Sequence, residues 1–242
     1  GMVPTQKTEN IIKDVQSALT LMQISVNEPD GFDPKLSKRN FKLSLGDISE
    51  SRVLPYLMEI VDGNAPRVSI GSYAYSRHDQ VHALSTNNLD FVVDPVIPIS
   101  DEINSMKVFE DSFVVAHRDN HELSKKSNVS IEDILNQRHL NVSNRKRGLH
   151  LIDIELEKIG YKREIALRCQ HFLIAPEIIR STDVVLFATK SFAEKNDLKY
   201  IEIPAEIPMM EYFLIWHKND EGDGGHIWMK NLLVEAFKKA KK

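Results

Sequence analysis

An alternating stretch followed by a helical stretch is the clearest pattern along the chain. Over residues 41–46, apolar side chains alternate with small or polar ones, which is the period of a β-strand. Gly46 breaks this strand, and apolar residues three and four positions apart then predict a helix over 49–62. Pro66 follows, and a second strand is predicted over 67–73. A strand, a helix and a strand in this order form a βαβ unit, so we expect the two strands to be parallel.

The rest of the chain continues to alternate between short apolar strands and helices. Further strands are predicted at 89–93, 106–117, 140–142, 164–168, 184–188, 200–203 and 210–217. Helices are predicted at 76–87, 130–136, 149–159, 174–180, 192–196 and 227–240. This pattern by itself predicts an α/β chain with two groups of strands and helices.

A separate helix is predicted ahead of this region, over residues 8–26. Thr8 can cap it, and its apolar residues form one stripe, at positions 11, 12, 15, 19, 22 and 26. The stripe has two interpretations. It either packs on the body of this chain or forms a dimer seam with another copy.

Composition narrows the function classes. A hydrophobic content of 42% and a charged content of 27% are ordinary for a soluble protein, and the net charge of −4 argues against broad nucleic-acid binding by this chain. The single cysteine, Cys169, excludes an internal disulfide, suits a reducing cytosol and is more typical of a small buried side chain than of a nucleophile. No segment has the roughly 18 apolar residues of a membrane span, and the N-terminus lacks the apolar region of a signal peptide.

Motifs of enzymes and metal sites are missing. The chain contains no GxSxG, Walker loop, HExxH or CxxC sequence. His117 and His121 are four residues apart, but they lie in a loop-like run with charged neighbours. Two carboxylates could still meet in space and act as acid and base, although no pair is singled out. We therefore expect neither an enzyme nor a bound metal or other cofactor.

Several short segments stand in a characteristic order. They are Phe32-Asp33-Pro34, Asp47-Ile48, Leu54-Pro55-Tyr56-Leu57-Met58, Ala65-Pro66, His171-Phe172, Ser181-Thr182-Asp183, Trp216-His217 and Ile227-Trp228-Met229. In this order and spacing they resemble the effector-binding domain of LysR-type transcriptional regulators. The resemblance is strongest to the branch that senses salicylate, nitroaromatic compounds and nodulation flavonoids, and it covers Met2 to Phe237.

The resemblance implies a type-2 periplasmic-binding-protein-like fold, with two α/β lobes joined by two crossover strands. It divides the chain into a linker helix at 1–30, a first lobe at 31–117 and 217–242, and a second lobe at 118–216. It also implies a cytoplasmic homodimer formed through the linker helix and the lobes, and a tetramer when the protein is full-length. Promoter DNA would be bound by a helix-turn-helix domain that this chain lacks, so we expect a truncated chain.

In such a fold the ligand lies between the lobes and faces the N-termini of helices. Because a helix N-terminus carries positive charge and unpaired N–H groups, an organic carboxylate is the expected ligand. The candidate contacts come from loops that follow strands. They are Asp47, Ser49, Tyr73, Ser76 and Pro95 in the first lobe, and Ser143, Arg145, His171 and Thr189 in the second.

Each of the first-lobe candidates has a structural alternative. Ser49 and Ser76 can simply cap their own helices. Tyr73 can be a surface aromatic residue, although two tyrosines in one strand-to-helix loop suit stacking against an aromatic ligand. Asp47 and Asp94 would repel an anion unless they are paired, and Asp94-Pro95 stands where the family has a small residue.

Each of the second-lobe candidates also has both a ligand-binding and a structural interpretation. Arg145 belongs to a basic run that is either solvated surface or a clamp for a carboxylate. His171 aligns with a histidine near the effector in aromatic-acid sensors, and otherwise it is a strand-end histidine with a backbone partner. Thr189 can donate its hydroxyl to a ligand or cap the helix that follows.

Taken together, these features predict the ligand-sensing domain of a bacterial LysR-type regulator. A small organic acid, preferably aromatic, would favour one lobe angle and so control DNA binding. Two other classes stay open: a solute-binding protein of a transport system, and an enzyme on the same two-lobed scaffold.

Overall fold

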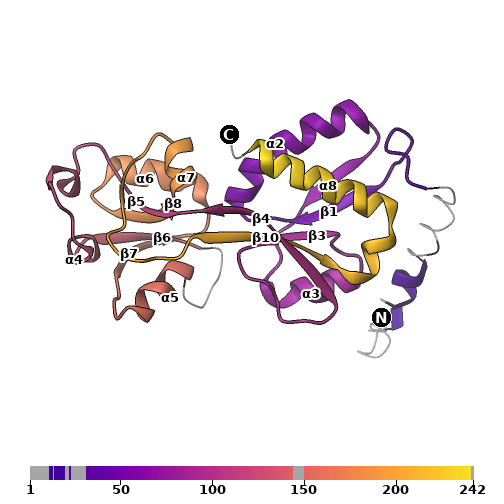
Figure 1. The fold of residues 1–242 in the computed structure, drawn as a ribbon, viewed down its shortest axis with the longest axis horizontal. Coiled ribbons are helices and arrows are strands. Elements are labelled where there is room, and N and C mark those ends of the chain that lie inside the picture. Colours follow the sequence, from indigo (N-terminus) through magenta and orange to yellow (C-terminus); the bar gives the residue numbers. More distant parts are fainter. Residues whose placement is uncertain (1–10, 13, 20–21, 23–30, 144–149, 241–242) are drawn as a thin grey trace, which may run out of the picture. The chain divides into compact units, whose positions relative to one another are not determined.

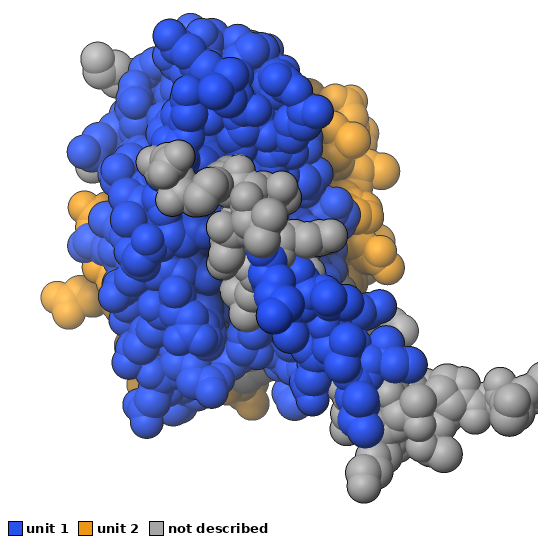
Figure 2. Space-filling model, turned by 90° about the vertical axis from the view of Figure 1, so that its right-hand side faces the viewer, with its two compact units in different colours: residues 1–109, 212–242 blue, residues 110–211 orange. Residues whose placement is uncertain are grey.

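The computed structural model of the chain describes residues 11–12, 14–19, 22, 31–143 and 150–240. These form two compact units (Figures 1 and 2). Unit 1 comprises residues 1–109 and 212–242, and unit 2 comprises residues 110–211. Each unit is built around one five-stranded sheet with helices on both faces. The predicted α/β fold with two sheets is confirmed.

Unit 1 contains the βαβ unit that the sequence predicts. Its sheet has the order β2-β1-β3-β10-β4. The strands are β1 (Asn40–Ser44), β2 (Ser69–Ser72), β3 (Phe91–Asp94), β4 (Ile103–Asp111) and β10 (Met210–His217). β1 runs parallel to β2 and to β3, as expected, whereas β10 is antiparallel to β3.

Helices α2 (Asp47–Asn64) and α8 (Gly224–Lys239) cover one face of this sheet, and α3 (Arg77–Ser85) covers the other (Figure 1). A 3-10 turn, η3 (Lys218–Gly222), precedes α8. The buried residues of α2 include Val53, Leu57 and Ile60, whose spacing places them on one face of the helix. The helix begins two residues earlier than predicted and accommodates Pro55 in its interior.

Unit 2 has the sheet order β7-β6-β8-β5-β9. The strands are β5 (Phe113–His117), β6 (Arg138–Val142), β7 (Glu164–Cys169), β8 (Val185–Thr189) and β9 (Lys199–Glu202). The helical elements are η1 (Glu122–Lys125), α4 (Ile131–Leu135), α5 (Leu151–Lys158), η2 (Phe172–Ile174), α6 (Ala175–Ser181) and α7 (Lys190–Lys195). Every residue of β5 and β8 is buried, which explains why both segments read as continuous apolar runs.

Two strands pair in the other sheet from the one that the sequence analysis assumed. Residues 113–117, predicted in the first lobe, pair with β8 and β9 in unit 2. Strand 210–217 was expected to cross back to the first lobe, although the predicted boundary at residue 217 leaves most of it in the second, and it pairs with β3 in unit 1. The chain therefore passes between units about one strand earlier in each case, because β4 and β10 are the strands that cross. An apolar run that is buried on both faces carries no information about which sheet it joins.

The described residues of the N-terminal segment, 11–12, 14–19 and 22, are helical. The described part of its apolar stripe is exposed: Ile11 is 53%, Leu19 55% and Met22 67% accessible. Thr8 and Val26 lie outside the described residues. The first interpretation, in which the stripe packs on the body of this chain, is therefore not what the structure shows. The dimer seam stays a prediction.

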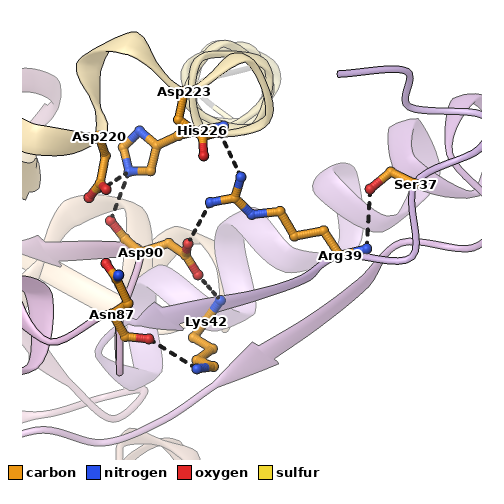
Figure 3. A network of polar contacts seen from close by, with 8 residues as sticks. All are labelled: Ser37, Arg39, Lys42, Asn87, Asp90, Asp220, Asp223 and His226. Atoms are coloured by element: carbon orange, nitrogen blue, oxygen red, sulfur yellow. Dashed lines mark hydrogen bonds and ion pairs between the residues drawn. The ribbon is translucent and has the colours of Figure 1, made fainter. Parts of the chain in front are cut away.

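A buried polar network ties the sheet of unit 1 to α8 (Figure 3). Arg39 donates to Asp223 at 2.6 Å and to Asp90 at 3.2 Å. Asp90 also accepts from the backbone N–H of Lys42 at 2.7 Å, and Asp223 accepts from the N–H of His226 at 2.7 Å, which caps α8. Because one guanidinium serves carboxylates from two elements, the network fixes how α8 lies on β1.

Candidate functional site

Five of the predicted site residues lie at one edge of the sheet of unit 1. β1, β2 and β3 are parallel, so their carboxyl ends and the loops that follow share this edge. Asp47 and Ser49 lie in the first turn of α2 after β1. Tyr73 and Ser76 follow β2, and Pro95 follows β3.

The N-terminus of α2 is capped without a side chain. The N-cap residue is Gly46, which has no side-chain group to offer, whereas Ser49 is the third residue of the helix and is buried. The alternative that Ser49 caps its own helix is therefore wrong. An uncapped helix start carries positive charge on its N–H groups, which suits an anionic ligand.

Ser76 occupies the N-cap position of α3. Its hydroxyl donates to the carboxylate of Asp79 at 2.6 Å and makes no capping bond to the backbone. Tyr73 is 48% exposed, and its N–H donates to the carbonyl of Leu43 at 2.9 Å, so its backbone is still fixed by β1.

Asp94 forms an ion pair, so its charge is balanced and need not repel an anionic ligand. Arg77 donates to Asp94 Oδ1 from Nε at 2.7 Å and from Nη2 at 2.5 Å, and the N–H of Val96 donates to the same oxygen at 2.8 Å. Sequence reasoning did not single out Arg77. It is the first residue of α3, where the helix dipole disfavours a cation. A cation in that position is a signal that it serves a nearby carboxylate.

Three of the second-lobe candidates lie at one edge of the sheet of unit 2. β6 runs parallel to β7 and β8, so the ends of these strands lie together. Ser143 follows β6, and its N–H donates to the carbonyl of Cys169 at the end of β7 at 2.9 Å. His171 follows β7, and Thr189 is the last residue of β8. Arg145 lies outside the described residues.

Thr189 has a buried hydroxyl that pairs with none of the described residues. The side chain is 2% exposed and stands at the N-cap position of α7, but it makes no capping bond. Other groups take that role. The N–H of Lys190 donates to the carbonyl of Ser112 at 2.9 Å, and Ser191 donates to the carboxylate of Asp111. The alternative that Thr189 caps this helix is therefore wrong.

His171 is exposed and directly precedes η2. Cys169, two residues earlier, is half-buried, and its thiol lies 3.8 Å from the carbonyl of His171. Burial raises the pKa of the Cys169 thiol, which disfavours the thiolate that a nucleophile needs.

His117 and His121 of unit 2 are both buried. The rings of His117 and His121 lie 5.5 Å apart, and His121 accepts from the N–H of Leu123 at 3.2 Å while its Nε2 donates to the carbonyl of Asp183 at 3.1 Å. Within residues 31–143 and 150–240, no group of three His, Cys, Asp or Glu side chains could hold a metal ion. Nor is any helix of the described chain long and apolar enough to cross a membrane.

Comparison with known proteins gives a family match over most of the chain. A family model for the LysR substrate binding domain matches residues 35–238. The HTH-type transcriptional activator NagR of Ralstonia sp is 28% identical over 244 residues, covering 99% of this chain and 81% of NagR. NahR of Pseudomonas putida, also an HTH-type transcriptional activator, is 24% identical over 241 residues, covering 98% of this chain and 80% of NahR.

Solved structures agree with this match. A probable transcriptional regulator from Pseudomonas aeruginosa superposes with a TM-score of 0.81 at 28% identity, covering 96% of this chain and 78% of that one. Two effector-binding domains share the fold at lower identity. They are QuiR in complex with shikimate, with a TM-score of 0.68, 16% identity and coverage of 84% and 99%, and BenM with benzoate, with a TM-score of 0.66, 12% identity and coverage of 84% and 91%. The predicted fold class is confirmed.

Proposed function

The chain belongs to the LysR family and contains its substrate-binding domain, and from this we propose that it senses a small aromatic carboxylate. The proposed contacts are the loop residues of the two sheet edges, Asp47, Ser49, Tyr73, Ser76 and Pro95 in unit 1 and Ser143, Arg145, His171 and Thr189 in unit 2. Binding of the effector would be read as a change in transcription. The prediction that the effector lies between the lobes stays a prediction.

The buried hydroxyl of Thr189 is the observation that supports this site most. A buried polar group without a partner costs roughly 1–3 kcal/mol, and such groups are rare unless they serve a function. Thr189 lies at the carboxyl end of β8, the edge where α/β sheets bind their ligands. A carboxylate oxygen of the effector could accept a hydrogen bond from the Thr189 hydroxyl, which none of the described residues accepts.

Charge supports an anionic effector as well. The start of α2 offers a positive helix end without a capping side chain. Asp94, which would otherwise repel an anion, is neutralised by Arg77. Benzoate and shikimate, the ligands of BenM and QuiR, are both carboxylates.

A binding assay tests the site. Thr189→Val removes the hydroxyl and keeps the shape of the side chain. We expect benzoate or salicylate to bind the variant about tenfold more weakly by calorimetry, while its melting temperature stays equal or rises, because an unpaired buried hydroxyl is lost. A ligand at a hundred times its Kd stabilises the wild-type chain by about 2.7 kcal/mol, so a thermal-shift panel can first identify the effector.

Thr182→Val is the matched control. Thr182 lies just before the opposite end of the same strand, where its hydroxyl donates to the carbonyl of Ile178 at 2.7 Å. This variant should bind the effector with wild-type affinity. Equal affinity of the Thr189 variant and wild type would show that the site is placed wrongly.

We propose further that the domain pairs with a second copy through α2 and through η2 with the α6 helix that follows it. Both segments expose large apolar side chains: Tyr56 and Met58 are each 38% exposed, Leu173 90% and Ile174 52%. Leu173→Glu should shift a dimer to a monomer in sedimentation experiments without changing the far-UV spectrum. A variant that remains dimeric would exclude this face.

We also propose that the domain binds its effector without converting it. The supporting observations are the transcriptional regulators among its relatives and the raised pKa of the only thiol. Effector incubated with the protein should be recovered unchanged. Recovery of a product would favour an enzyme on this scaffold instead.

A further inference from the structure

Gly71 is a glycine in the interior of a strand. It lies in β2, opposite Lys42 of β1 in the parallel register. Glycine weakens a strand, because it has more freedom to lose on folding and no side chain to pack. Its backbone does not need glycine, since its φ is not among the positive values in the chain. The position therefore calls for another explanation.

The side chain of Tyr73 provides that explanation. Residues two apart in a strand point to the same side of the sheet, so the side chains of 71 and 73 share one face. A Cβ atom on Gly71 would lie 2.5 Å from the hydroxyl oxygen of Tyr73, 2.6 Å from Cε2 and 2.8 Å from Cζ. All three distances are shorter than a van der Waals contact. The hydroxyl end of the tyrosine ring therefore lies against Gly71, in the space that any other side chain would occupy.

One backbone and one side-chain hydrogen bond hold the chain next to this ring. The N–H of Tyr73 donates to the carbonyl of Leu43 at 2.9 Å, and the hydroxyl of Ser72 donates to the carboxylate of Glu50 in α2. With the ring resting on Gly71, nearly half of the side chain, 48%, stays exposed. An exposed tyrosine ring held at one end can pack against an aromatic ligand, and it gains less from an aliphatic one.

We propose that Tyr73 selects aromatic over aliphatic carboxylates, and that Gly71 is the positioning residue that leaves room for the hydroxyl end of the ring. This inference rests on the proposed function, because it assigns a specificity to the same site. It adds that the preference depends on a residue whose own side chain contacts no ligand.

The test compares two carboxylates of similar size, benzoate and cyclohexanecarboxylate, in four variants. Tyr73→Leu removes the aromatic face, and Gly71→Ala forces the ring to move. The displaced atoms are at the far end of a flexible side chain, so Gly71→Ala should leave the melting temperature nearly unchanged. Both variants should lower the preference for benzoate about fivefold to tenfold. Tyr73→Phe retains an aromatic ring and should keep the preference for benzoate. Gly63→Ala should also keep this preference, because a Cβ on Gly63 meets nothing within 4 Å.

A second measurement needs no ligand. With only ten glycines in the chain, selective labelling resolves the α-protons of Gly71 by NMR. The ring current of Tyr73 should displace them from the usual position of a strand glycine in the wild-type chain, and Tyr73→Leu should remove that displacement. An unshifted Gly71 signal in the wild-type protein would overturn the geometry.

The outcomes separate the two proposals. Wild-type preference in both Gly71→Ala and Tyr73→Leu overturns this inference and leaves the proposed function intact. A change in Tyr73→Leu alone overturns the role of Gly71. A wild-type chain that binds neither benzoate, salicylate nor cyclohexanecarboxylate overturns the proposed carboxylate effector, and with it the selectivity.

Discussion

Acid should weaken unit 2 through the buried side chain of His139. The ring is fully buried at the start of β6, where it stacks on Phe187 with the ring centres 5.3 Å apart. Its Nε2 donates to the carbonyl of Ile134 at 3.1 Å. Burial, and next the positive charge of Arg163, lowers the pKa of His139 to about 4. The folded chain therefore holds this histidine neutral at pH values where the unfolded chain protonates it.

The sign of the effect follows from proton uptake. An unfolded histidine titrates near pH 6.5, so between pH 6.5 and 4 the unfolded state binds more protons than the folded state. The free energy of unfolding then falls as the pH is lowered through this window. A pKa of about 4 for folded His139 implies a loss of about 2.4 kcal/mol between pH 7 and pH 4.5. That is a large part of the roughly 5–15 kcal/mol that stabilises a typical domain.

His139→Gln tests this reasoning, because a glutamine amide can still donate to the carbonyl of Ile134 and does not titrate. Both tryptophans, Trp216 and Trp228, lie in unit 1, so tryptophan fluorescence does not report on unit 2, which contains His139. Hydrogen exchange of the β6 and β8 amides, corrected for intrinsic rates, does report on unit 2. We expect protection in the wild-type chain to fall by about 2 kcal/mol more than in the variant between pH 7 and pH 4.5.

His82→Gln is the control, since this histidine is exposed on α3 in unit 1. It should leave the exchange of β6 and β8 unchanged at both pH values. If His139→Gln lost as much protection in acid as the wild-type chain, burial of this ring would not be the origin of the acid sensitivity.

Two further substitutions test buried charges. Burial, together with the charges of Asp90 and Asp223, raises the pKa of Asp220 to about 6, so its ionised form destabilises the fold above that pH. Asp220→Asn should stabilise unit 1 by up to about 3 kcal/mol at pH 8 in urea unfolding followed by tryptophan fluorescence, and the gain should vanish toward pH 4. Arg163, 3% exposed, donates to Asp153 at 2.6 Å. Arg163→Met should cost roughly 3 kcal/mol in unit 2, because it leaves a half-buried carboxylate unpaired, and a loss below 1 kcal/mol would contradict that.

Local patterns in the sequence predicted the elements well, because they depend on residues close together in the chain. The alternation of Phe41 and Leu43 and the helical spacing of Leu54, Leu57, Met58 and Val61 are sufficient to predict the first βαβ unit. Phe41, Leu43, Leu57 and Val61 are buried as expected, whereas Leu54 is only partly buried and Met58 is 38% exposed. Sheet membership is a different problem. Residues 113–117 are apolar on both faces, and their partners in β8 lie about 70 residues later, so nothing nearby indicates which sheet they join.

The same distinction applies to the site. Loops after parallel strands could be predicted to gather at one edge, because this follows from the topology alone. The sequence could not predict which side chains already have a hydrogen-bond or ion-pair partner. Asp94 finds its partner in Arg77, 17 residues away on another element, and Thr189 loses its expected capping role to Asp111 and Ser112. Neither relation has a local signature beyond the unusual placement of Arg77.

The ion pair of Asp94 with Arg77 removes one of the charges that would oppose the proposed anion at the unit 1 edge. Formal charges alone would give the opposite answer, because Asp47 and Glu50 lie in the first turn of α2 and Asp94 follows β3. Arg77 neutralises Asp94, and Glu50 accepts a hydrogen bond from Ser72, so both of these carboxylates have partners. This edge also contains the start of an 18-residue helix whose N-cap residue is a glycine, and an exposed tyrosine whose hydroxyl end lies against Gly71. A carboxylate attached to an aromatic ring is the ligand chemistry that uses both features at once.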